Sequence, residues 1–184
     1  GPDPGTIGGP ASVPWLTSAV NGVTAAQMDI ALERSEVNWG SIAQKEVIAY
    51  LAAAPTTGRQ QFLDGAGNVV KYEIIRTPAQ YRGWDNGFVT QNFSSSWAPD
   101  VPKVIASINS RNNLETAGNN TTGDGGWLRR EVETTANQQT RVRMTVDEVR
   151  NGTKNSDGDR TKNNAEIAGI FAFNRGFAID PVKL

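Results

Sequence analysis

The chain has 184 residues, a net charge of −1 at pH 7 from 18 basic and 19 acidic residues, and neither cysteine nor histidine. Without cysteine there are no disulfides, thiolate nucleophiles or iron–sulfur clusters, and without histidine there is no Ser-His-Asp triad and no histidine-ligated metal. The balanced charge argues against electrostatic capture of nucleic acid. We therefore expect no nucleic-acid partner, no metal and no cofactor. Glycosidases need only carboxylates, so that enzyme class remains open.

The start of the chain is rich in proline and glycine over residues 1–22, which is typical of a linker or arm. We expect a flexible arm there, followed by one domain over 23–184. Such an arm fits a tether to a larger parent polypeptide. No apolar run approaches the roughly 18 residues of a transmembrane helix, so no membrane span is expected.

The first predicted element is an amphipathic helix over roughly 24–36. Thr24 is a favourable N-cap, and Met28, Ala31 and Leu32 follow at the spacing of one helical face. This helix is expected to pack against the next one as a helical hairpin.

Two more helices are predicted further along the chain. In 41–54, residues such as Ile48 and Leu51 share one face, and Pro55 ends the helix. A third helix is expected over 101–117.

The C-terminal third of the chain has the period-two pattern of strands. Val142, Met144 and Val146 alternate with polar residues, which predicts a half-buried strand. The apolar run EIAGIFAFN predicts a partner strand, and the polar segment 151–165 is expected to join the two as a long hairpin. An earlier turn and strand are predicted in DGAGNVVKYEIIR. The predicted fold class is α+β, a helical domain with a C-terminal β-hairpin.

Two carboxylates at the end of the first predicted helix are candidate catalytic acids. Glu36 lies one turn beyond Leu32, at the edge of the apolar face, and Trp39 is close enough in sequence to supply an apolar wall. Apolar surroundings favour the neutral carboxyl that a general acid needs. Glu33 falls beneath Asp29, toward solvent. The alternative interpretation is an ordinary surface glutamate paired with a neighbouring cation.

Several pieces of this region form a recognisable series, namely Glu33 and Glu36, Gly40, Ala43, Val47-Ile48, Pro78, Gln80, Tyr81 and Trp84. Over residues 33–86 the chain thereby resembles the cell-wall hydrolases typified by spore-cortex-lytic enzymes, within the lysozyme-like superfamily. The resemblance implies a lysozyme-like helical domain. It also implies a muramidase or lytic transglycosylase that cleaves peptidoglycan, with Glu36 or Glu33 as the general acid.

If that resemblance holds, one short segment supplies the side chains of a glycan groove. Tyr81 and Trp84 are suited to stacking on sugars, and Gln80 and Asn86 to binding hydroxyl and acetamido groups. Asp85 is a candidate second carboxylate. The alternative is a loop whose aromatic side chains fill the core. The implied setting is secreted or periplasmic, as an antibacterial effector with an immunity protein or as part of a phage particle.

Two other functions remain open. The chain suits a non-catalytic structural or binding module of a phage or secretion assembly, because it is rich in Asn, Gly and Thr. Arg82, the serines 94–96 and the pair Glu131 and Glu133 also resemble, in order, the triplet by which ADP-ribosyltransferase toxins bind NAD. An enzyme acting on glycan would need Glu36 in a groove beside the aromatic side chains, whereas a structural module would bury those aromatics.

A last motif lies in residues 155–166, where Asn155, Asp157, Asp159 and Glu166 occupy four ligand positions of an EF-hand calcium loop. Position 6 is Arg160 rather than the required glycine, and the flanks are predicted strands. A polar turn is therefore the favoured interpretation.

Overall fold

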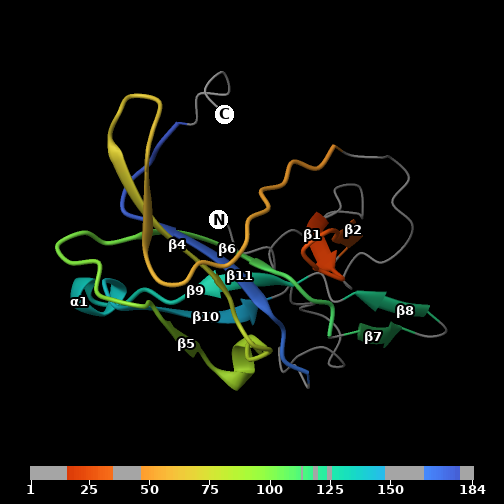
Figure 1. The fold of residues 1–184 in the computed structure, drawn as a ribbon. Coiled ribbons are helices and arrows are strands. Elements are labelled where there is room, and N and C mark those ends of the chain that lie inside the picture. Colours follow the sequence, from red (N-terminus) through yellow and green to blue (C-terminus); the bar gives the residue numbers. More distant parts are fainter. Residues whose placement is uncertain are drawn as a thin grey trace, which may run out of the picture.

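The computed structural model describes residues 16–34, 47–112, 114–117, 120–123, 126–147 and 164–178 (Figure 1). These residues are built mainly from strands, with one short helix, α1 (Thr135–Gln138), and one 3-10 turn, η3 (Trp84–Asn86). The strands are β1 (Leu16–Asn21), β2 (Asp29–Arg34), β3 (Gln60–Leu63), β4 (Val69–Arg76), β5 (Val89–Asn92), β6 (Lys103–Ile108), β7 (Leu114–Ala117), β8 (Asn120–Gly123), β9 (Trp127–Arg130), β10 (Arg141–Asp147) and β11 (Ala168–Phe173). None of these helical elements is long or apolar enough to cross a membrane.

The predicted α+β fold with a lysozyme-like helical domain is therefore wrong. Where a helix was expected over 24–36, the chain forms the hairpin strand β2, paired antiparallel with β1. Ile30 and Leu32 are half-buried and Ala31 between them is exposed. This is a two-residue period, which a strand satisfies and a helix does not. β1 also occupies the end of the segment expected to be a linker.

The other two predicted helices are absent from the described residues as well. The described part of the second, 47–54, has no regular secondary structure, and 41–46 lies outside the described residues. The region of the third holds β6 and β7 instead. In β6, Val104 and Ile108 face the core while Lys103 and Ile105 are exposed, again with a period of two. Without a surface to pack on, an isolated helix of this length is marginal in water.

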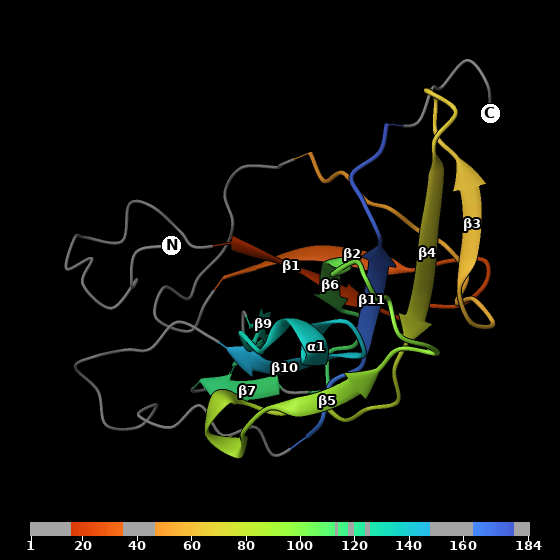
Figure 2. The same ribbon diagram turned by 90° about the vertical axis from the view of Figure 1, so that its left-hand side faces the viewer.

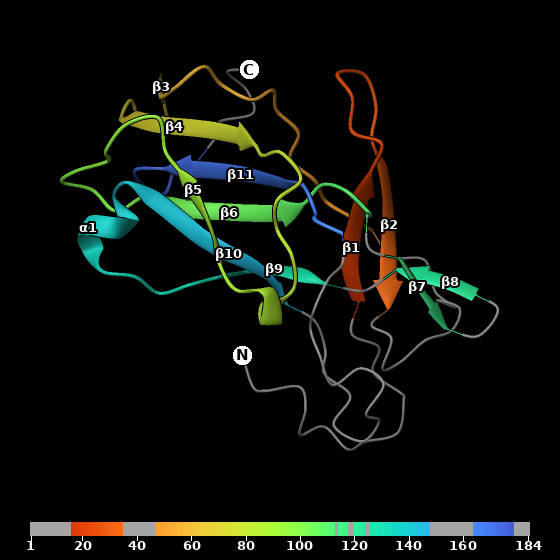
Figure 3. The same ribbon diagram turned by 90° about the horizontal axis from the view of Figure 1, so that it is seen from below.

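Two sheets enclose the core. One has the strand order β3-β4-β11-β6 and the other the order β5-β10-β9, with every paired neighbour antiparallel. β6 and β9 lie beside each other and bring the two sheets together on one side. Figure 3 shows β4, β11 and β6 side by side, with β10 and β5 crossing over them. The hairpins β1-β2 and β7-β8 form separate two-stranded sheets.

The core lies between the inner faces of these two sheets. Both β10 and β11 contribute three fully buried apolar residues to it: Val142, Met144 and Val146 from β10, and Ala168, Ile170 and Ala172 from β11. Tyr81, Phe93 and Trp97, which lie outside the strands, complete the same cluster. Burial of this apolar surface is the main term that stabilises the fold.

Both C-terminal strands were predicted correctly, but their pairing was not. β10 and β11 belong to different sheets, so they are not the two arms of a hairpin. β10 pairs with β5 and β9, and β11 pairs with β4 and β6. The predicted turn and strand in DGAGNVVKYEIIR are present as the β3–β4 turn and β4.

At the edge of the four-stranded sheet opposite β6, β3 pairs only with Val69–Tyr72 of β4. The remaining end of β4 lies near β5 without pairing, and Glu73 contacts Ser94 just after β5. We call this boundary the seam; it is defined by Glu73–Arg76 on β4 and Val89–Asn92 on β5. The view in Figure 2 shows β4 and β5 as strands of separate sheets. The seam gives the domain an open side.

Candidate functional site

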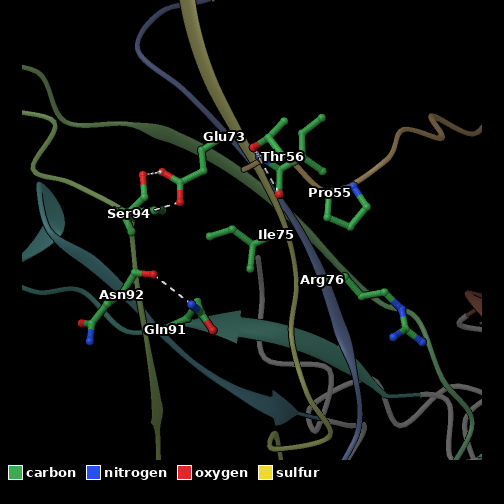
Figure 4. A pocket seen from close by; sticks show the side chains of 10 residues that line it. Pro55, Thr56, Glu73, Ile75, Arg76, Gln91, Asn92 and Ser94 are labelled. Atoms are coloured by element: carbon green, nitrogen blue, oxygen red, sulfur yellow. Dashed lines mark hydrogen bonds between the residues drawn. The ribbon is translucent and has the colours of Figure 1, made fainter. Parts of the chain in front are cut away.

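The seam holds a groove with a volume of about 290 Å³ (Figure 4). Its two walls come from the outer end of β4 and from β5 with the residues that follow it, and Pro55 and Thr56 close it at one side. The lining residues are Pro55, Thr56, Glu73, Ile74, Ile75, Arg76, Gln91, Asn92, Phe93 and Ser94. Polar and apolar side chains thus both line this groove, which is open to solvent.

A buried carboxylate ties the two walls together. Glu73 is only 4% exposed, and its Oε1 accepts a hydrogen bond of 2.9 Å from the backbone N–H of Ser94. The Ser94 hydroxyl donates to Oε2 at 3.0 Å. A buried carboxylate held by two donors is satisfied, so Glu73 serves the structure here.

The backbone of β5 offers a free edge to the groove. Along a strand, the backbone N–H and C=O groups of successive residues point alternately to the two sides. Phe93 N–H donates to Thr140 C=O, just before β10, so the backbone groups of Gln91 and Val89, two and four residues earlier, also face β10. Those of Thr90 and Asn92 point the other way, toward the seam. The Asn92 carbonyl accepts from Gln91 Nε2 at 2.8 Å. The N–H groups of Thr90 and Asn92 make no hydrogen bond within the described part of the chain.

The facing edge of β4 is partly filled by the chain itself. Thr56 N–H donates to Ile74 C=O at 2.9 Å, and Ile74 N–H donates to the Thr56 hydroxyl at 3.1 Å. Arg76 is two residues further along, so its backbone groups point to the same side. Its side chain is exposed at the groove and forms no ion pair with any described residue.

Of the predicted glycan-binding residues, Gln80 lies next to this groove. Its Nε2 donates to Gln91 Oε1 at 3.3 Å, and Gln91 lines the groove. The groove therefore presents amide, hydroxyl and guanidinium groups to a ligand, together with free backbone N–H groups of β5. Chemically, such a set binds polar acceptors and extended backbone.

Tyr81, expected to stack on a sugar, is a core residue with no exposed surface. Its backbone pairs with Glu166 in an isolated bridge, and its hydroxyl has no hydrogen-bond partner among the described residues. Burial raises the pKa of Tyr81, and the nearby Gln80 side chain opposes that shift. The alternative interpretation, an aromatic residue that fills the core, therefore describes Tyr81.

Trp84 is half-buried, and its ring packs against Phe88 and Arg129. Its ring contacts Phe88 edge to face at a centroid distance of 5.2 Å, and the Arg129 guanidinium lies 4.4 Å from the ring centroid. Arg129 also pairs with Asp147 at 2.8 Å. One face of the indole is thus occupied by a cation, and Trp84 lies outside the groove lining.

The remaining residues of the predicted glycan segment lie in η3. Asp85 and Asn86 are exposed, and Asn86 Oδ1 accepts from the N–H of Gly83 as the cap of that turn. The Arg82 carbonyl before it accepts from Thr145 and Val146 on β10. The segment therefore covers the outer side of β10, which explains why Thr145 is fully buried despite its place in the polar half of the alternation.

The two candidate acids stand differently in the structure. Glu33 lies in β2 opposite Thr17, on a strand instead of a helix end. Glu36 and Trp39 lie outside the described residues.

The glutamates of the other two candidate motifs, the NAD-binding triplet and the calcium loop, make contacts within the protein. Glu133 Oε1 accepts from Arg141 at 2.6 Å, and Glu131 pairs with Arg143, so both glutamates of the NAD-binding triplet have cationic partners. Glu166, the last position of the calcium motif, accepts from the Asn112 N–H and the Ser110 hydroxyl. Positions 155–163 of that motif lie outside the described residues. Within the residues that are described, no three acidic side chains are placed to hold a metal.

Sequence reasoning missed the groove. Its walls are brought together by pairings that no local pattern reports, since β4 and β5 belong to different sheets. β5 itself reads Val-Thr-Gln-Asn, in which three polar residues follow one apolar residue, so its sequence has no period-two apolar pattern that would predict a strand.

Comparison with protein-family models, with characterised proteins and with solved structures finds no match for this chain.

Proposed function

We propose that this chain is a non-catalytic structural or binding module of a larger assembly, such as a phage particle or a secretion machine, and that it joins its partner through the groove at the seam. The observation that carries the proposal is the complete burial of Tyr81 in the core. A glycan-cleaving enzyme of the kind first considered needs that ring beside a catalytic glutamate, whereas a structural module uses it for packing.

The chemistry of the groove supports the same proposal. Its one buried carboxylate, Glu73, accepts hydrogen bonds from both the backbone N–H and the hydroxyl of Ser94, so both of its oxygens are used in joining the walls. The other polar groups that line the groove are hydrogen-bond donors and acceptors, which suit the binding of a partner. Such a module would act outside the cytoplasm, on the wall or on a virion, and would be attached to a larger polypeptide.

A second candidate function is glycan binding without cleavage, with peptidoglycan as the ligand. It is favoured by the polar side chains of Thr56, Gln91, Asn92 and Ser94 along the groove, together with Gln80 behind it. Amide and hydroxyl groups of this kind are suited to sugar hydroxyls and acetamido groups.

One experiment separates these functions from the peptidoglycan-cleaving enzyme. Purified sacculi are incubated with the protein and sedimented, the supernatant is analysed by mass spectrometry and the pellet is assayed for bound protein. The structural module predicts no released muropeptides and no cosedimentation. Cosedimentation that Gln91→Ala abolishes and Gln61→Ala leaves intact would favour the glycan-binding module. Release of muropeptides that Glu36→Gln or Glu33→Gln abolishes would overturn the proposal.

A further inference from the structure

One segment of this chain is unusually apolar and exposed. Residues 47–54 read VIAYLAAA, contain no charged side chain and have no regular secondary structure. Val47 is fully exposed, Tyr50 is 69% exposed and Leu51 is 62% exposed. No backbone hydrogen bond joins this segment to the rest of the described chain. Exposed apolar surface of this kind marks a site of interaction.

The seam has unpaired backbone donors and apolar surface that an extended apolar segment could cover. Its β5 edge has unpaired N–H groups at Thr90 and Asn92, and its floor includes Ile75, which is half-buried and points into the space between the walls (Figure 4). A polypeptide in extended conformation would pair with such an edge and cover the floor with every second side chain. An uncharged apolar segment does this without desolvating a charge.

The length of the segment 47–54 and its place beside the groove also suit pairing with β5. β5 has four residues, and the groove beside it is matched by a strand of similar length. The segment 47–54 has twice that length and ends at Pro55, directly before Thr56. Within its own chain, Thr56 already binds the β4 edge at Ile74. Residues 49–55 before it are exposed, and none of 47–55 contacts either wall through a hydrogen bond within the described part of the chain. The segment is therefore free to reach another molecule.

We infer that two copies of this chain associate by donating residues 47–54 of each to the seam of the other, where the segment pairs with the free edge of β5. The inference rests on the proposed function as a non-catalytic module that binds through the groove, and it names the partner as a second copy. A reciprocal exchange closes as a two-fold dimer in which the β5 edge of each copy is covered.

The test uses one position where the backbone donor can be removed without touching the β5–β10 pairing. Thr90→Pro deletes the N–H that faces the seam, and proline is tolerated where the lost N–H faces away from the neighbouring strand. Thr90→Ala is the matched control, because it shortens the same exposed side chain and keeps the N–H. A second variant, Val47→Ser with Leu51→Ser, removes apolar surface from the donated segment and leaves the seam intact. Far-UV circular dichroism and thermal melting establish that each variant is folded.

Molar mass is measured by light scattering after size exclusion, over a dilution series of the full chain. We expect wild type and Thr90→Ala to form dimers. Thr90→Pro and the double serine variant should dissociate at concentrations at least about tenfold higher, the effect of losing one hydrogen bond or a buried apolar contact. A monomeric wild type at high concentration would overturn the inference. So would a dimer that both variants leave unchanged.

A cross-linking experiment identifies the contact itself. The chain has no cysteine, so Leu51→Cys and Thr90→Cys proteins can be prepared separately, mixed and oxidised. A disulfide between the peptides carrying positions 51 and 90, found by mass spectrometry, is the expected product. Its absence from a dimeric mixture would overturn the inference. Neither measurement depends on sacculi, so failure here leaves the proposed non-catalytic function to be judged by its own experiment.

Discussion

The carboxylate of Glu73 on β4 accepts hydrogen bonds from both the backbone N–H and the hydroxyl of Ser94, the second residue after β5, at 2.9 and 3.0 Å. This pair joins the two sheets across a boundary where their strands do not pair. It also closes one end of the groove, so the width of the candidate site depends on it.

Removing the hydroxyl from this pair should weaken the fold measurably. We expect Ser94→Ala to lower the free energy of unfolding by about 1 to 2 kcal/mol, because it removes one hydrogen bond to a buried charged group while the backbone bond remains. Urea denaturation measures the change. Ser95→Ala is the control, since it removes a neighbouring exposed hydroxyl that does not contact Glu73; equal losses in both variants would contradict the assignment.

Tyr81 should tolerate loss of its hydroxyl but not of its ring. The hydroxyl is buried without a partner among the described residues, so Tyr81→Phe should change the free energy of unfolding by less than about 1 kcal/mol. Tyr81→Ala leaves a cavity in the core and should cost about 3 to 5 kcal/mol. Chemical denaturation of the two variants gives both values. A loss well above about 1 kcal/mol for Tyr81→Phe would contradict this, because it would mean that the hydroxyl makes a hydrogen bond that stabilises the fold.

Asp64 should make the β3–β4 turn sensitive to acid. The hydrogen bond from the backbone N–H of Asn68, the largest cause, holds the pKa of Asp64 below its usual value, and Ala66 N–H adds to the effect. A pKa that is lower in the folded state stabilises the fold above the unfolded value, about 3.9, and this stabilisation is lost as the pH falls through the folded pKa.

The variant Asp64→Asn tests that pH dependence. Asparagine keeps a side-chain oxygen but carries no charge, so wild type should be more stable than the variant at pH 7 and the two should converge near pH 2. Urea midpoints across this range are sufficient. A difference that stays constant with pH would mean that the carboxylate charge contributes nothing to the turn.

The sequence predicted a strand correctly where the apolar pattern fits a strand and not a helix. Val142, Met144 and Val146 alternate cleanly and are buried in β10 as predicted. The prediction failed in 24–36, where the apolar residues Met28, Ala31 and Leu32 also fit helical spacing although the chain alternates from Met28 to Leu32 in the structure. Short apolar patterns of this length are ambiguous between helix and strand.

The sequence did not predict which strands pair with which. β10 and β11 follow each other in the chain, and consecutive strands often pair, yet these two lie in different sheets. β10 pairs with its predecessor β9 but also with the distant β5, and both partners of β11, β4 and β6, lie far from it in the chain. The groove depends on the same long-range arrangement, because Glu73 and Ser94 are 21 residues apart. The Tyr81 and Trp84 region was recognised as aromatic, but its burial follows from the pairing of the sheets and not from the residues themselves.

The most direct test of this account is residue-by-residue amide hydrogen exchange along β5, measured by NMR on dilute protein. An open seam predicts alternation: Val89 and Gln91 donate to β10 and should exchange slowly, whereas Thr90 and Asn92 face the groove and should exchange fast. Concentrating the protein should slow exchange at these two amides. Equal protection of all four residues at every concentration would mean that β4 and β5 are joined, and would contradict both the groove and the functions proposed from it.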